Sequence, residues 1–76
     1  MKTKIGQIAG RVWTIVGEKE SVDISKIPRM LKEKGEIVYQ ALGWLAREDK
    51  VEFHRKEGKT FVSLNAEERR IYKNPL

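Results

Sequence analysis

The sequence predicts a small, mainly helical α+β domain, and three observations indicate this class. The chain has 76 residues, too few for a second domain with a core of its own. Apolar residues recur at helical spacing in three segments, and two short β-prone runs lie on either side of a glycine-containing turn. We therefore expect one domain over residues 1–76, with a core at 4–64 and a C-terminal helix or tail at 65–76.

The composition excludes several classes of protein. Cysteine is absent, which rules out disulfides, thiolate metal sites and a cysteine nucleophile. No apolar run approaches the roughly 18–20 residues that a membrane-spanning helix requires, and the N-terminus does not read as a signal peptide. From these features we predict a cytoplasmic protein that does not contact a membrane.

The first helix is expected from about Lys4 to Val16. Its apolar face is formed by residues at helical spacing, namely Ile5, Ile8, Ala9, Val12, Ile15 and Val16. Gly17 stands where a helix often ends in a left-handed residue, so we expect the helix to stop there.

A short edge strand and a short helix come next. Val22–Ile24 alternates apolar and polar residues, enough to pair at the edge of a small sheet. Ser25 reads as the N-cap of a second helix, and Pro28 is tolerated because it falls in the first turn. This helix is expected to end near Lys34 and Gly35.

The third helix, from Glu36 to Glu48, has the clearest periodicity. Its inward residues are Val38, Ala41, Leu42, Leu45 and Ala46. The face turned away from the core carries Glu36, Gln40, Gly43 and Arg47. Ile37 and Trp44 share one flank of this helix, whereas Tyr39 lies on the other.

Two extended runs, Val51–Arg55 and Thr60–Leu64, predict a β-hairpin. Gly58 lies in the connecting segment and supplies the positive φ that a tight reversal requires. Alternation directs Val51 and Phe53 to the core, opposite Val62 and Leu64, and it leaves Glu52, His54 and Phe61 on the other face.

A last short helix is expected after the hairpin. The segment Asn65–Glu68 has the spacing of a capping box, so the helix should begin at Asn65. It would carry Arg69, Arg70, Ile71 and Tyr72.

The order of these elements is that of a winged helix-turn-helix domain: a three-helix core, a short edge strand, a two-stranded hairpin wing and a short C-terminal helix. Two strings, Ile5–Trp13 (IGQIAGRVW) and Val38–Lys50 (VYQALGWLAREDK), closely resemble a family of small prokaryotic winged helix-turn-helix proteins of unknown function. The resemblance covers roughly residues 5–64 and implies the fold, but it supplies no substrate or operator. Relatives tend to carry Ser or Asp before the third helix, where this chain reads Lys34-Gly35-Glu36.

The third helix is the candidate reader of duplex DNA. Arginine pairs with guanine and glutamine with adenine in the major groove. Gln40 and Arg47 are seven residues apart and share one face, Gly43 between them permits close approach, and Tyr39 could contact a phosphate. Glu36 lies on the same face and Glu48 follows Arg47, so a merely solvated helix face is an equally good interpretation.

Basic residues near this helix are candidates for phosphate contacts. The second helix contributes Lys26, Arg29 and Lys32, and the wing contributes Arg55, Lys56 and Lys59. The formal charge of +5 comes from 16 Lys+Arg against 11 Asp+Glu and is spread evenly along the chain. Only the fold could gather it on one side, and charged turns also serve simply to keep hairpin edges from aggregating.

A second set of residues predicts a surface for a partner chain. Gly6 and Gly10 form a smooth strip beside Trp13 on the first helix, suited to close packing either within the monomer or against a partner. Ile37 and Trp44 lie off the main core direction, and Ile71 and Tyr72 lie in the tail. From these residues we expect a homodimer.

Nothing in the sequence predicts catalysis. The single histidine, His54, lies on the hairpin, and no cluster of residues at metal-ligand spacing and no phosphate loop is present. We therefore predict a non-enzymatic protein without a cofactor or metal. Its leading function is DNA binding of the kind seen in transcription regulators, and the alternative is a protein-interaction module that uses the winged fold as a scaffold.

Overall fold

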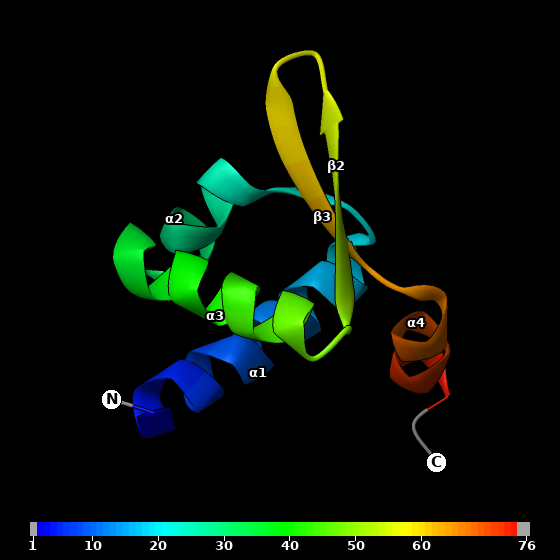
Figure 1. Cartoon of the computed structure of the whole chain (residues 1–76), viewed down its shortest axis with the longest axis horizontal. Helices are drawn as coiled ribbons and strands as arrows, with labels where there is room; N and C mark the ends of the chain where they lie inside the picture. Colours follow the sequence, from blue (N-terminus) through cyan, green and yellow to red (C-terminus); the bar gives the residue numbers. More distant parts are fainter. Residues whose placement is uncertain (1, 75–76) are drawn as a thin grey trace.

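The chain forms four α-helices, three strands and one short 3-10 helix over residues 2–74, which the computed structural model describes (Figure 1). In chain order they are α1 (Lys2–Lys19), β1 (Val22–Asp23), the 3-10 helix η1 (Ile24–Lys26), α2 (Ile27–Leu31), α3 (Gly35–Arg47), β2 (Val51–Lys56), β3 (Lys59–Leu64) and α4 (Ala66–Lys73). The predicted fold class and order of elements are confirmed.

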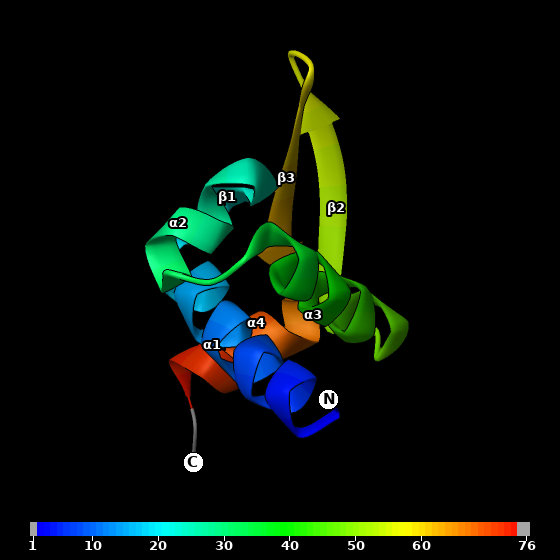
Figure 2. The same cartoon turned by 90° about the vertical axis from the view of Figure 1, so that its left-hand side faces the viewer.

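The three strands form one antiparallel sheet in the order β1-β3-β2. Val22 pairs with Val62, and Val51 pairs with Leu64, so one face of the sheet turns these four apolar residues toward the helices. Beyond this base the β2–β3 hairpin projects away from the helices as a wing (Figure 2). Its two-residue turn has both Glu57 and Gly58 at positive φ, as predicted for the glycine.

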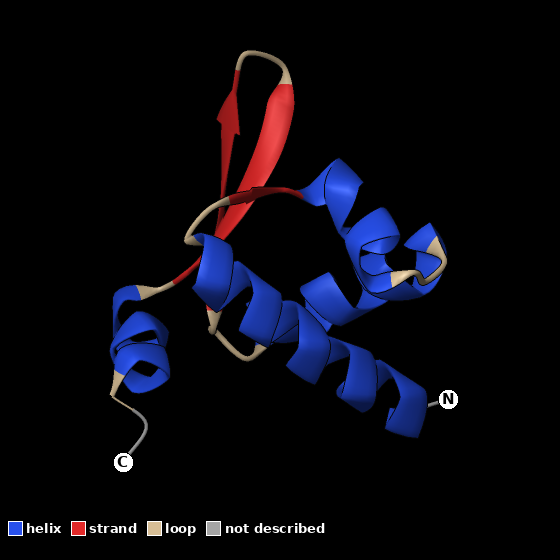
Figure 3. Cartoon of the chain, turned by 180° about the vertical axis from the view of Figure 1, so that it is seen from behind, coloured by secondary structure: helices blue, strands red, loops and turns tan. Residues whose placement is uncertain are grey.

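The core lies between α1, α3 and the inner face of the sheet. Its most deeply buried large side chains are Ile8, Val12, Val16, Ile27, Val38 and Val62. Figure 3 shows the molecule from behind, with α1 in front of the other helices and α4 at the base of the hairpin. The predicted inward faces of the first and third helices are therefore largely confirmed.

The predicted end of the first helix was wrong. Gly17 lies inside α1, which continues to Lys19 before Glu20 takes the left-handed conformation with a φ of 70°. Gly17 is present for a packing reason instead, because the ring of Tyr72 lies against it.

The second helix also differs from its prediction in how it starts and ends. Ser25 does not cap it: Asp23 caps η1, the 3-10 helix before α2, since its carboxylate accepts a hydrogen bond from the backbone N–H of Ser25 at 3.0 Å. The N-cap of α2 itself is Lys26, which makes no side-chain capping bond. The helix ends at Leu31, earlier than predicted, and Lys32 at its C-cap adopts the left-handed conformation. Gly35 is the first residue of α3, and Lys34 at its N-cap makes no side-chain capping bond.

Phe53 is the residue whose predicted burial was wrong. It pairs with the buried Val62 and shares its face, yet 44% of Phe53 is exposed. The core reaches only the base of the hairpin. Alternation along β2 therefore predicts the face on which Phe53 lies but not how deeply its side chain is buried.

The cap at Asp23 makes stability depend on pH. Hydrogen bonds from the backbone and hydroxyl of Ser25, helped by the charges of Lys59 and Lys26, hold the pKa of Asp23 below its usual value. A depressed pKa stabilises the folded state above the unfolded pKa, and that contribution is lost as pH falls through the folded pKa.

We therefore expect Asp23→Asn, which keeps an oxygen acceptor for Ser25, to lower the urea midpoint near neutral pH. The difference in urea midpoint between the variant and the wild type should disappear as the pH falls from about 5 to about 2, because Asp23 becomes neutral in the wild type too. Urea titrations across this range provide the measurement. A gap that stays constant with pH would show that the charge of Asp23 plays no part.

Candidate nucleic-acid interface

The outer face of α3 is exposed, as predicted. Gln40, Gly43 and Arg47 lie on it, opposite the buried Val38 and Leu45. Among the residues that the structure describes, neither Gln40 nor Arg47 has a side-chain hydrogen bond or ion pair. A Cβ at Gly43 would meet nothing within 4 Å, so no contact inside the chain requires a glycine there.

Tyr39 lies on a flank of this face, away from the side on which Gln40 lies. The ring of Tyr39 lies toward α2, since a Cβ at Gly35 would be 3.5 Å from its Cε2 atom and 3.9 Å from Cγ of Pro28. Gln40 instead lines a pocket of about 370 Å³ together with Lys4 and Ile37. Tyr39 therefore lies on the flank of α3 that was predicted for it, and Gln40 lies on the side of the outer face that is nearer to Ile37.

The turn between α2 and α3 is held from behind by α1. Arg11 donates from Nη2 to the backbone oxygen of Leu31 at 2.8 Å and from Nη1 to the carboxylate of Glu33 at 3.3 Å. Lys4 reaches the same carboxylate at 3.4 Å. These contacts fix the position of α3 relative to α2, a role for Arg11 that the sequence did not reveal because it depends on a residue 20 positions away.

The basic residues in and next to α2 lie at two positions. Lys26 and Arg29 lie together around a shallow pocket with Ser25 and Met30. Lys32 lies at the other end of the helix, at its C-cap. Only Lys26 and Arg29 therefore form a local pair near the start of α2.

The basic residues of the wing lie on its two faces. Alternation puts Arg55 on the same face as Phe53, where its guanidinium donates to Oγ1 of Thr60 at 3.1 Å. Lys56 and Lys59 pair with each other across the strands on the opposite face. Lys26 lies in η1, which packs against β3, and the charges of Lys59 and Lys26 both help to lower the pKa of Asp23.

The cations predicted to contact DNA differ from several other cations because they form no ion pair. None of the seven candidates forms an ion pair in the described part of the chain: Lys26, Arg29, Lys32, Arg47, Arg55, Lys56 and Lys59. The four cations that are paired all lie outside the predicted interface, and they are Lys4, Arg11, Lys50 and Arg70. Lys19, Lys34, Arg69 and Lys73 are likewise unpaired, so the free cations are not confined to one face.

Acidic residues interrupt the positive surface at both ends of α3. Glu36 is exposed at its start, and Glu48 and Asp49 are exposed just after its end. The positive charge near α3 therefore comes mainly from α2 and the wing on either side, with Arg47 contributed by α3 itself.

Two of the residues predicted for a partner surface contact each other within the chain. The rings of Trp13 and Tyr72 meet edge to face, with centroids 5.5 Å apart. Nε1 of Trp13 donates to Oε1 of Glu68 at 2.8 Å, and Lys50 lies 3.8 Å from the same oxygen. The predicted cap of α4 is confirmed, because Asn65 accepts from the backbone N–H of Glu68. These contacts attach α4 to α1.

The other residues predicted for a partner surface are exposed or partly exposed. Trp44 is 44% exposed and Ile71 is 48% exposed, whereas Ile37 is half-buried. A Cβ at Gly6 or Gly10 would meet nothing within 4 Å, so packing inside the chain explains neither glycine. Of the two readings offered for this strip, close packing within the monomer is excluded for Gly6 and Gly10.

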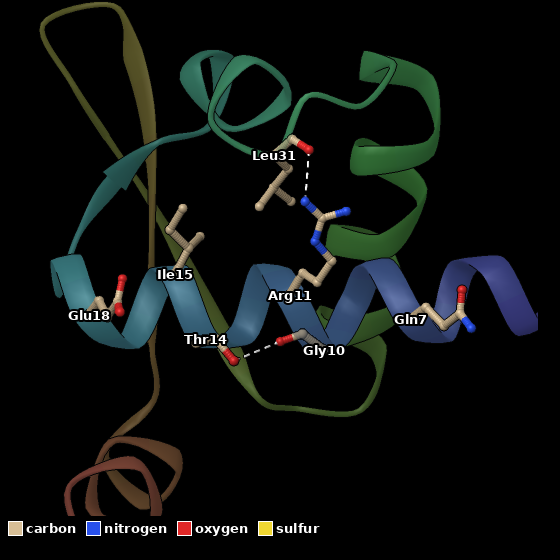
Figure 4. A pocket seen from close by; sticks show the side chains of 7 residues that line it. All are labelled: Gln7, Gly10, Arg11, Thr14, Ile15, Glu18 and Leu31. Carbon is tan, nitrogen blue, oxygen red and sulfur yellow. Dashed lines mark hydrogen bonds between the residues drawn. The ribbon is translucent and has the colours of Figure 1, made fainter.

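A shallow pocket of about 450 Å³ lies along α1 (Figure 4). Ile15 and Leu31 contribute its apolar surface, and its polar lining consists of Gln7, Arg11, Thr14 and Glu18. Among the described residues there is no group of side chains that could hold a metal ion, and no helix is long and apolar enough to cross a membrane.

The helix-turn-helix of α2 and α3, followed by a projecting hairpin, defines the class: this is a winged helix-turn-helix domain. The chain belongs to the family described as winged helix-turn-helix domain DUF2582, whose model matches residues 1–64. The resemblance carried by the Ile5–Trp13 and Val38–Lys50 strings is thereby confirmed. Helix α4 lies beyond the matched residues.

Relatives and structural neighbours agree with this assignment. An uncharacterized protein of Methanocaldococcus jannaschii is 44% identical over 61 residues, covering 78% of this chain and 86% of that protein. The solution structure of a Bacteroides thetaiotaomicron protein is 33% identical, with a TM-score of 0.76, over 87% of this chain and 80% of that one. A mutant of Lactococcus lactis ZitR in apo form has a TM-score of 0.81 at 17% identity, which shows the fold alone; the match covers 97% of this chain but 58% of ZitR.

Proposed function

We propose that this protein binds duplex DNA in the manner of a transcription regulator, with α3 in the major groove and no catalytic activity. The observation that carries the proposal is the outer face of α3, where Arg47 is exposed and free of any partner in the described chain, beside a glycine that nothing in the fold requires. A winged domain presents this helix to the groove and its wing to the flanking backbone. Such a function would place the protein with the DNA in the cytoplasm.

Different side chains on and around α3 would contact the bases and the phosphates. Arg47 is suited to guanine and Gln40 to adenine, each through two parallel hydrogen bonds. Tyr39, on the flank beside α2, would contact a phosphate, as would Lys26 and Arg29 near the start of α2. Lys32 at the end of α2 and the wing residues Arg55, Lys56 and Lys59 would add further phosphate contacts.

A titration with duplex DNA at several salt concentrations tests the proposal. With several of the seven free cations on phosphates, the plot of log affinity against log salt should have a slope of about −4 or steeper. The wild-type protein and a labelled mixed-sequence duplex suffice, read by fluorescence anisotropy. Failure to bind at micromolar protein in low salt would overturn the proposal.

Trp44 favours a second candidate, a protein-interaction surface that includes a homodimer contact. A tryptophan that is 44% exposed beside the half-buried Ile37 leaves apolar area uncovered on α3. Gly6 and Gly10, and Ile71 on α4, offer additional uncovered surface. Light scattering distinguishes a monomer from a homodimer. A monomer at high concentration would contradict the homodimer, whereas a dimer that dissociates in the Trp44→Ala variant would support it.

A further inference from the structure

The outer face of the wing, the one turned away from the core, carries a stacked aromatic pair. His54 of β2 and Phe61 of β3 are directly opposite each other in the register. Their rings are nearly parallel, with an interplanar angle of 14° and centroids 5.8 Å apart. His54 is exposed and Phe61 is half-buried, so the pair presents ring surface to solvent.

Lysines surround this pair on the side of the wing tip. Lys56 and Lys59 form the next cross-strand pair on the same face, and Lys26 lies in η1, which packs against β3. None of the three has an ion pair in the described residues. The carboxylates on this face are Asp23, which is almost fully buried and held by Ser25, and Glu52, which lies on the opposite side of His54 from Lys56. Glu57 is exposed in the turn beyond Lys56 and Lys59. The exposed charge next to the rings is therefore positive on the tip side, with one carboxylate at the tip itself, and negative toward the base.

This combination fits an unpaired nucleotide. A cross-strand aromatic pair can stabilise a hairpin without any ligand, but that stabilisation does not require three free lysines beside it. Proteins that bind single strands combine aromatic rings, on which bases stack, with cations that follow the phosphates. A base inside a duplex is already stacked on both sides, so a flat aromatic surface selects bases that are unpaired.

We propose that the outer face of the wing binds single-stranded nucleic acid, with an unpaired base stacked on the His54–Phe61 pair and the adjoining phosphates on Lys56, Lys59 and Lys26. This site does not rest on duplex binding by α3. It uses the sheet face opposite to that of Phe53 and Arg55, and the base approaches from the tip because Glu52 repels phosphates at the other end.

The experiment compares the wild type with His54→Ala on three labelled twelve-nucleotide strands: oligothymidylate, oligouridylate and an abasic strand of equal length. The wild type should bind the abasic strand about fivefold or more weakly than oligothymidylate, since the abasic strand retains the phosphates but has no base to stack. His54→Ala should lose a similar factor on oligothymidylate and little on the abasic strand. Comparing oligothymidylate with oligouridylate shows whether DNA or RNA is preferred.

Phe53→Ala is the matched control, because Phe53 precedes His54 on the same strand but faces the other way. It should leave binding of single strands unchanged, and the ring protons of His54 and Phe61, not those of Phe53, should shift upfield in NMR spectra on adding oligothymidylate. Equal losses for His54→Ala and Phe53→Ala, or equal affinity for abasic and normal strands, would overturn the proposal. Arg47→Ala separates the two sites, since it should weaken duplex binding only.

Discussion

Replacing Gly17 by alanine should lower the free energy of unfolding by about 1–3 kcal/mol, the usual cost of forcing extra volume into a packed site. A Cβ at this position would lie 2.6 Å from Cδ1 and 2.8 Å from Cγ of Tyr72. The colliding atoms belong to a planar ring that is also in edge-to-face contact with Trp13, so the ring cannot move aside without disturbing that contact. We expect α4 to shift away from α1 and the hydrogen bond between Trp13 and Glu68 to weaken.

Gly10→Ala is the matched control, because it makes the same chemical change on the same helix. A Cβ at Gly10 meets nothing within 4 Å, so alanine should raise the free energy of unfolding by about 0.5–1 kcal/mol through its better helix propensity. Urea unfolding followed by circular dichroism measures both variants, and tryptophan fluorescence in a Trp44→Phe background, where only Trp13 emits, reports the detachment of α4. A Gly17→Ala variant as stable as Gly10→Ala would mean that Tyr72 does not pack on α1 in solution.

Local patterns were enough to predict most of the fold. The apolar periodicity of α1 and α3, the alternation in β2 and β3 and the glycine at the hairpin turn each depend on neighbouring residues only. Where prediction failed, the deciding contact was distant in sequence. We predicted a helix end at Gly17 because its neighbours in the sequence do not reveal the contact with Tyr72, which is 55 residues away. Phe53 read as buried because alternation does not show where the core stops.

The candidate interface was predictable in part. The exposed face of α3 follows from helical periodicity, so Gln40, Gly43 and Arg47 were identified from the sequence. The division of the wing cations between two faces also follows from alternation once the register is known. The position of Lys26 beside β3 does not, since it depends on how η1 packs against the sheet. The hydrogen bond from Arg11 to the backbone oxygen of Leu31 likewise could be identified only from the folded structure.

Arg47→Ala should weaken the binding of a preferred duplex site by about 1–3 kcal/mol and relax the choice of base at one position. The guanidinium has no partner in the described chain, so its removal should cost the fold little and the complex much. The appropriate control is Arg69→Ala, which removes an exposed, unpaired arginine of α4, far in the chain from α3. Anisotropy titrations with a selected duplex and with its single-base variants measure both the affinity and the specificity.

Gly43→Ala tests the same face by a different route. Alanine should stabilise α3 by about 0.5–1 kcal/mol, since its Cβ meets no atom of the chain. If the backbone of α3 lies close to base edges, that Cβ has to displace the DNA, and the affinity should fall although the protein is more stable. A gain in stability with unchanged duplex affinity would show that the α3 backbone does not approach the DNA at Gly43. Unchanged affinity in both Gly43→Ala and Arg47→Ala would remove α3 from the interface altogether and favour the exposed flank of Trp44 as the functional surface.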